Sequence, residues 1–120
     1  MLENPSSVKI HTMNAIILTE IINRLQALNP YKVILFGSHA NGKANEDSDV
    51  DLFIVLKDDV VPTSFREKKE IYLKVSRLLR DIAFRVPLDL IVQTKAEYEK
   101  FIAAGSLFCQ TITKQGKQLL

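Results

Sequence analysis

Hydrophobic side chains recur every three or four positions between Met13 and Leu28, with polar residues between them. This spacing predicts an amphipathic helix whose apolar side packs on a sheet. Asn29-Pro30 should end the helix, because proline disfavours the helical conformation in the residue before it. Residues 1–12 show no clear period and are expected to form a loosely held start.

Three short apolar runs predict β-strands at residues 31–36, 49–56 and 87–92. Beyond its first acidic residues, the second run is apolar on both alternating faces. A strand of this kind is expected at the centre of a sheet, covered on both sides. Between the first two strands, the sequence predicts a short helical turn from Ser38 to about Ala44, followed by a polar loop.

The second half of the chain carries helix signals. Residues 64–67 read Ser-Phe-Arg-Glu, a capping box that should open a helix whose apolar face extends to Ile82. Residues 94–103 predict a short helix capped by its threonine, and residues 105–106 should open a last one. Residues 117–120 remain an unassigned tail.

Length and composition bound the function classes. The chain has 120 residues, of which 47% are apolar, and this suits a single domain over 1–120. A net charge of +2 argues against a protein that binds nucleic acid through bulk charge. Cys109 is the only cysteine, which excludes an intrachain disulfide. No stretch approaches the roughly eighteen apolar residues of a membrane span, so we expect a cytoplasmic protein.

Two acidic residues stand at the start of the second strand. Asp49 and Asp51 project from the same face of an extended chain, about 6 to 7 Å apart along the backbone. Two carboxylates placed in this way repel each other, and a divalent cation would let both stay ionised at neutral pH. Hard oxygen ligands suit Mg²⁺, which often completes its shell with substrate phosphates. The alternative is a solvated strand end without a metal.

A glycine and a serine follow the first strand directly. A sharp bend at Gly37 into a short helix would leave unpaired backbone N–H groups and the Ser38 hydroxyl available to an anion. The alternative is that glycine only permits a positive φ. Residues 37–44 also nearly match the phosphate-binding loop Gly-x4-Gly-Lys-[Ser/Thr], but Ala44 lacks the hydroxyl that would hold Mg²⁺. Together, the bend and the acid pair suit a nucleoside triphosphate with its Mg²⁺.

A third acid lies in the third strand. Asp89 stands between Leu88 and Leu90, which point to the opposite face. A lone acid in an apolar strand is costly to bury without a partner. A salt bridge to Arg85 or a lysine would satisfy it, and so would a role in a metal site.

These motifs together resemble a known family. The segments G37-S38-H39-A40-N41-G42 and S48-D49-V50-D51-L52, followed by Asp89, resemble the minimal nucleotidyltransferases of the polymerase-beta-like superfamily. The resemblance extends in element order over nearly the whole chain. It implies an α/β (α+β) fold with a small mixed sheet of three or more strands flanked by helices. It also implies transfer of a nucleoside monophosphate, commonly AMP from ATP, to an acceptor hydroxyl.

The resemblance implies a role for each motif residue. The triphosphate would lie on Gly37 and Ser38, with Lys43 as an additional candidate for nucleotide binding. One Mg²⁺ would be held by Asp49 and Asp51. A second would lie between these two and Asp89, which would also help to deprotonate the acceptor.

The motif departs from the family at two positions. Relatives often carry arginine at one or both variable positions of the glycine-serine motif, where this chain has His39 and Asn41. These two side chains offer less positive charge to a triphosphate.

The resemblance also suggests a partner. Small proteins of this type often act as antitoxins beside a helical protein of the HEPN kind, either by nucleotidylating it or by binding it. The chain could also form a homo-oligomer. The helix after Ser64 carries a basic outer face, which is either simply solvated or a docking surface for an acidic partner or RNA.

Overall fold

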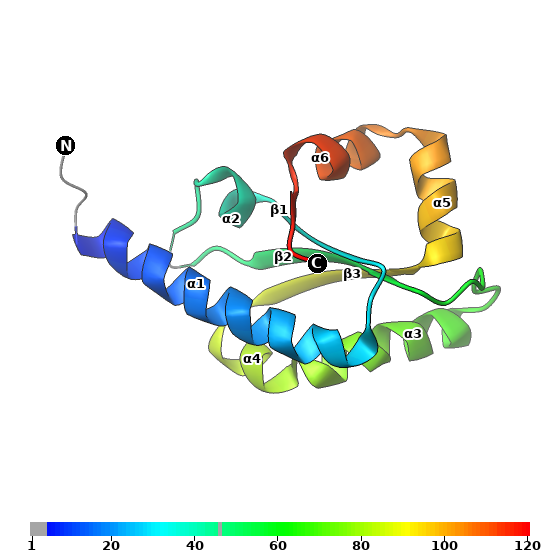
Figure 1. Cartoon of the computed structure of the whole chain (residues 1–120), viewed down its shortest axis with the longest axis horizontal. Helices are drawn as coiled ribbons and strands as arrows, with labels where there is room; N and C mark the ends of the chain where they lie inside the picture. Colours follow the sequence, from blue (N-terminus) through cyan, green and yellow to red (C-terminus); the bar gives the residue numbers. More distant parts are fainter. Residues whose placement is uncertain (1–4, 46) are drawn as a thin grey trace.

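The computed structural model describes residues 5–45 and 47–120. Four strands and six α-helices are present in this part of the chain, with one 3₁₀ turn (Figure 1). In chain order the elements are α1 (Pro5–Leu25), η1 (Gln26–Leu28), β1 (Lys32–Phe36), α2 (Ser38–Asn41), β2 (Val50–Leu56), α3 (Phe65–Leu78), α4 (Arg80–Arg85), β3 (Leu88–Thr94), α5 (Lys95–Ala104), α6 (Leu107–Gln115) and β4 (Lys117–Gln118).

The four strands form one mixed sheet in the order β3-β2-β1-β4. β1 runs antiparallel to β2 and to β4, whereas β2 and β3 are parallel. The predicted α/β fold with a mixed sheet is therefore confirmed, and β2 is central as its two-sided apolar pattern indicated. All five residues of β2 after Asp51 are buried.

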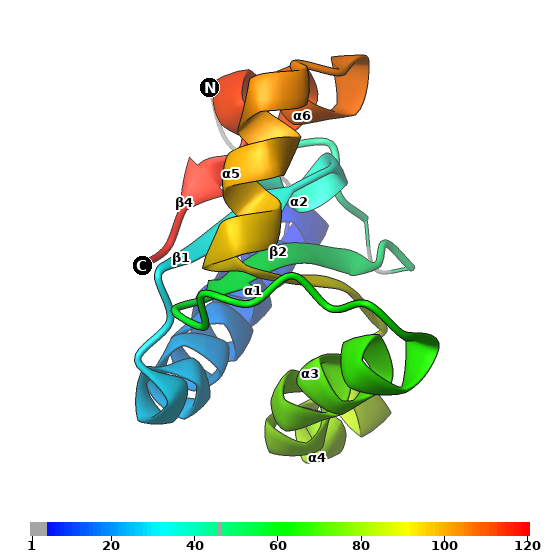
Figure 2. The same cartoon turned by 90° about the vertical axis from the view of Figure 1, so that its right-hand side faces the viewer.

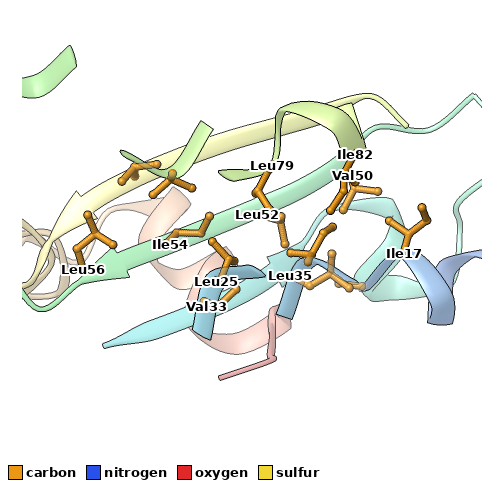
Figure 3. Packing of buried hydrophobic residues seen from close by; sticks show 14 residues of the cluster. Ile17, Leu25, Val33, Leu35, Val50, Leu52, Ile54, Leu56, Leu79 and Ile82 are labelled. Atoms are coloured by element: carbon orange, nitrogen blue, oxygen red, sulfur yellow. The ribbon is translucent and has the colours of Figure 1, made fainter. Parts of the chain in front are cut away.

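Helices cover both faces of the sheet. α1, α3 and α4 lie on one side, and α5 and α6 lie on the other (Figure 2). On the first side, alternate residues of β2 pack against α1, α3 and α4, as Figure 3 shows for Leu52 with Leu25 and Leu79. On the second side, Phe53 and Val55 of β2 pack against α5 and α6. β1 and β2, the strands next to the glycine bend and the acids, are thus packed by apolar side chains on both faces.

The start of the chain differs from the prediction. Residues 5–12 are helical and belong to α1, so the expected loose start is wrong for them. Residues 1–4 lie outside the described residues. Pro5 is the first helical residue, a position that suits proline because its missing N–H would be unpaired there anyway.

Later parts of the chain also differ from the prediction. The single helix expected after Ser64 is broken at Leu79, whose backbone (φ −104°, ψ 8°) separates α3 from α4. The unassigned tail forms β4, which pairs with β1 through Lys117 and Gln118. In the capping box, the Ser64 hydroxyl accepts from the Glu67 amide at 3.1 Å, but the Glu67 carboxylate accepts from the Thr63 amide instead of closing the box.

The helices on the first side are also tied by charge. The Arg24 guanidinium of α1 donates to both carboxylate oxygens of Asp81 in α4, at 2.5 and 2.7 Å. This hydrogen bonding lowers the pKa of Asp81 to about 2.

In the described residues, no helix is both long and apolar enough to cross a membrane.

Candidate active site

The bend after β1 brings a backbone atom against an acidic side chain. β1 ends at Phe36, and Gly37 adopts φ 73° and ψ −155° before α2 begins. A Cβ built on Gly37 would lie only 2.1 Å from Oδ2 of Asp51. A side chain at this position would be strained by the left-handed φ and would force the Asp51 carboxylate to shift. Gly37 therefore does more than permit the bend, since it allows the bend to touch Asp51.

The short helix α2 leaves amide groups available. The Gly37 carbonyl accepts from Ala40 at 3.1 Å and Asn41 at 3.3 Å, and the Ser38 carbonyl accepts from Lys43 at 3.0 Å. Within residues 5–45 and 47–120, the amides of Ser38 and His39 have no hydrogen-bond acceptor. α2 ends at Asn41, where Gly42 (φ 76°) terminates it, so the turn is shorter than the predicted span to Ala44.

The three acids lie at one end of the sheet. Asp51 is directly paired with Asp89 in the parallel register of β2 and β3, and with Phe36 in the antiparallel register of β1. Neighbouring strands lie about 4.8 Å apart, so the two carboxylates share one face at close range. Asp49 immediately precedes β2. Asp51 is half-buried, whereas Asp49 and Asp89 are exposed.

The environment of Asp51 disfavours its charge. Partial burial raises the pKa of this carboxyl, and the negative charges of Asp89 and Asp49 raise it further. His39 acts in the opposite direction. These contributions indicate that the carboxylates of Asp49 and Asp89 lie close enough to Asp51 to disfavour its charged form.

The metal assignment stays a prediction. Within residues 5–45 and 47–120, no three histidine, cysteine, aspartate or glutamate side chains are already gathered tightly enough to hold a metal ion. The chemistry of Asp49, Asp51 and Asp89 nonetheless fits a divalent cation, because all three offer hard carboxylate oxygens. A cation between them would also remove the repulsion that raises the pKa of Asp51.

Asp89 does not form the salt bridge with Arg85 that was the alternative to a metal site. Arg85 forms an ion pair with Glu20 of α1 instead. In the described part of the chain, no lysine or arginine forms a salt bridge with Asp89 either. Its carboxylate is therefore exposed beside Asp51 without a structural ion pair.

The two positions that depart from the family motif make local bonds. His39 Nε2 lies 3.2 Å from the carbonyl oxygen of Ser48, the residue before Asp49. In a tautomer with the proton on Nε2, the ring donates this bond and ties α2 to the loop that presents the acid. Asn41 Oδ1 accepts from the Lys43 amide at 3.1 Å. This role of His39 was not predicted, and its only signal in the sequence is its place inside the motif.

The Lys43 side chain, the third predicted nucleotide-binding group, is exposed after α2. Among the described residues it forms no salt bridge. The backbone of Lys43 therefore lies in the bend, while no ion pair with a described residue orients its ammonium group.

Most of the chain matches a known protein family. Residues 18–108 match the family described as nucleotidyltransferase domain, a span that includes the glycine-serine bend and all three acids. A search of curated proteins found no significant match.

Solved structures share the fold at low identity. A proposed nucleotidyltransferase from Sulfolobus solfataricus aligns with a TM-score of 0.61 and 21% identity, covering 98% of this chain and 89% of that one. A chain of a toxin–antitoxin complex crystallised with AMP-PNP aligns with a TM-score of 0.54 and 23% identity, covering 86% of this chain and 72% of that one. A mutant of the toxin–antitoxin complex MntA–HpeT aligns with a TM-score of 0.50 and 20% identity, covering 86% of this chain and 71% of that one. On the family match and the shared fold, this chain belongs to the nucleotidyltransferase domain family.

Proposed function

We propose that this protein is a Mg²⁺-dependent nucleotidyltransferase that moves AMP from ATP to a hydroxyl group. The observation that carries the proposal is that the bend at Gly37, whose next two amides are unpaired within the described residues, lies against Asp51, and that Asp51 is paired with Asp89 in the neighbouring strand. A triphosphate bound with its metal needs both kinds of group side by side.

The bend would hold the phosphates. The amides of Ser38 and His39 have no hydrogen-bond acceptor among the described residues, so they can donate to phosphate oxygens. The Ser38 hydroxyl and Lys43 would add two further contacts. Gly37 keeps the phosphates close to Asp51, because it has no side chain to hold them away.

The acids would hold metal and accept the proton. Asp49 and Asp51 would hold one Mg²⁺, and Asp89 would join them at a second. When bound, magnesium would neutralise charge on the phosphates and on the attacking oxygen. In the reaction, the acceptor oxygen forms a bond to the α-phosphorus, the bond from that phosphorus to the bridging oxygen breaks, and pyrophosphate leaves. Asp89, exposed and outside any salt bridge of the described residues, would take the hydroxyl proton.

We further propose that the acceptor lies on a helical HEPN-type protein. Two structures with the same fold are toxin–antitoxin complexes, one of them crystallised with an ATP analogue. A binding-only antitoxin is the second candidate function. It is favoured by one observation, namely that His39 and Asn41 make local bonds and provide no arginine for the triphosphate.

Incubation with labelled ATP, Mg²⁺ and a helical partner tests the proposal. The expected result is a covalent mass increase of the partner by one or more adenylates, which disappears in a chain carrying both Asp49→Asn and Asp51→Asn. If the double variant still neutralises the partner while no adenylate is transferred, binding alone is the function. If the double variant loses both the transfer of adenylate and the neutralisation of the partner, catalysis is supported.

A further inference from the structure

A groove runs along the outer edge of the sheet, beside the strand that carries Asp89. β3 is an edge strand, and α3 packs next to it (Figure 1). The groove has a volume of about 350 Å³. Its lining is largely apolar, with two lysines, and comprises Phe65, Lys68, Lys69, Tyr72, Leu90, Ile91 and Val92. Phe65 is 83% exposed and Tyr72 41% exposed, so both rings are open to a ligand.

The backbone of β3 faces this groove with unpaired groups. The Val50 amide donates to the Pro87 carbonyl, which fixes the parallel ladder so that Asp89 and Ile91 bond to β2. Leu90 and Val92 then direct their N–H and C=O groups away from β2. Within residues 5–45 and 47–120 no hydrogen bond satisfies these groups. An open strand edge is a template for an added extended chain.

The charge around the groove selects an acidic partner. Lys69 lines the groove and forms no salt bridge within the described residues, whereas Lys68 is paired with Glu97. Lys69 also lines an adjacent hollow of α3 with Arg77, Leu73 and the ion pair of Arg66 with Glu70, so that Lys69 and Arg77 are its two basic residues outside any salt bridge of the described residues. A second copy of this chain added at the same edge would bring two such basic helices together. Like charges would oppose that dimer, and they would favour an acidic segment.

We infer that this groove binds an extended, acidic segment of the acceptor protein as an additional strand on β3. The inference rests on the proposed function and names the substrate class of the same site. A residue of the added strand opposite Asp89 would place its side chain on the face of the acids, about 5 Å across. A serine, threonine or tyrosine at that place would present its hydroxyl to Asp89.

The test uses a synthetic nine-residue peptide that alternates valine and glutamate around a central tyrosine, and a matched peptide with lysine in place of glutamate. Binding to the full chain is measured by fluorescence anisotropy without nucleotide. Phe65→Ser removes an apolar wall of the groove, and Phe84→Ser is its control because Phe84 is 81% exposed on α4, outside the groove. Lys69→Glu reverses the rim charge, and Lys100→Glu on α5 makes the same change elsewhere.

We expect the acidic peptide to bind and the lysine peptide to bind at least about tenfold more weakly. Phe65→Ser and Lys69→Glu should each weaken binding about tenfold, with both controls within about twofold of the native chain. Hydrogen exchange at the Leu90 and Val92 amides should slow when the peptide is bound. This last readout separates an added strand from a peptide held only by side chains.

Several results would overturn the inference: no binding at about 1 mM peptide, equal binding of the two peptides, or equal effects of the groove variants and their controls. A dimer that Phe65→Ser dissociates would make a second copy the occupant. Tighter binding of single-stranded RNA at the same residues would also contradict it. Mg²⁺-ATP binding is measured separately by calorimetry and reports on the proposed function. A chain that binds Mg²⁺-ATP but no peptide would contradict only the groove inference, and a chain that binds peptide but no Mg²⁺-ATP would contradict only the proposed function.

Discussion

Gly37 and Asp51 lie so close together that a single methyl group cannot fit between them. Gly37 directly follows β1, whose last residue Phe36 pairs with Asp51 of the antiparallel strand β2, and a Cβ on Gly37 would meet Oδ2 of Asp51 at 2.1 Å. The bend that offers amides to an anion and the acid expected to hold a cation are thus packed as one unit. Nucleotide binding and local stability should therefore respond together to changes at either residue.

Substituting Gly37→Ala should destabilise the protein strongly. The new Cβ would collide with Asp51, and alanine would be held at a positive φ, for a loss of roughly 2–4 kcal/mol in the free energy of unfolding. Urea denaturation measures this loss. Gly42→Ala is the matched control, since Gly42 has a similar φ of 76° but nothing within 4 Å of its Cβ. It should lose only about 1 kcal/mol. Equal losses at the two glycines would show that the contact with Asp51 is unimportant.

Substituting Asp51→Asn should stabilise the metal-free protein at neutral pH. Burial, with the charges of Asp89 and Asp49, raises the pKa of Asp51 in the folded state. Above that raised pKa the Asp51 carboxylate is charged in the folded and in the unfolded chain, and its unfavourable surroundings in the folded chain lower the free energy of unfolding. The penalty disappears as the pH falls through the raised value towards the ordinary 3.8. The asparagine variant should gain roughly 0.5–1 kcal/mol at pH 7 and nothing at pH 3. A variant less stable than the native chain at pH 7 would contradict this electrostatic account.

Substituting Asn41→Arg should tighten nucleotide binding. Asn41 is exposed in the bend, so an arginine can reach solvent without disturbing the core. The added charge should lower the Kd for Mg²⁺-ATP by about three- to tenfold, as measured by calorimetry. His39→Arg is the informative comparison: it removes the bond from α2 to the Ser48 carbonyl, whereas Asn41→Arg removes only the local bond from the Lys43 amide, so His39→Arg should gain less. Unchanged affinity in Asn41→Arg would mean that the phosphates do not approach this side of the bend.

Substituting Thr94→Val should loosen the connection between β3 and α5. The Thr94 hydroxyl is fully buried, donates to the Val60 carbonyl at 2.6 Å and accepts from the Glu97 amide at 3.2 Å. Valine keeps the shape and removes both bonds, for an expected loss of about 1–3 kcal/mol in thermal or urea unfolding. Thr111→Val, at an exposed threonine bonded only within its own helix, should change stability by less than about 0.5 kcal/mol. A Thr94 variant as stable as this control would contradict the capping role.

Most of the fold was predictable because its signals are local. β2 reads as a central strand since both of its faces are apolar, and Thr94 caps α5 with the reciprocal box of Glu97. β4 was not predictable, because Lys117 and Gln118 are polar, exposed and held only by pairing with β1. The break at Leu79 has no glycine or proline to announce it, and the helical start at Pro5 lacks a hydrophobic period.

The candidate site divides in the same way. The sequence motif selects Gly37, Asp51 and Asp89, and the sheet brings them together. The steric reason for Gly37 required the register between β1 and β2, which no local pattern contains. The bond from His39 to Ser48 likewise joins two segments whose separation in space the sequence does not give. Contacts between elements, unlike the elements themselves, depend on tertiary packing.

Titration of Mg²⁺-ATP against the native chain and against the variant with both Asp49→Asn and Asp51→Asn tests the central claim most directly. The account predicts saturable calorimetric binding with a Kd of about 1 mM or tighter for the native chain, weakened at least about tenfold in the double variant. Circular dichroism should show both chains equally folded. Absence of binding to the native chain, or binding that the double variant retains in full, would contradict the assignment of this bend and these acids as a nucleotide site.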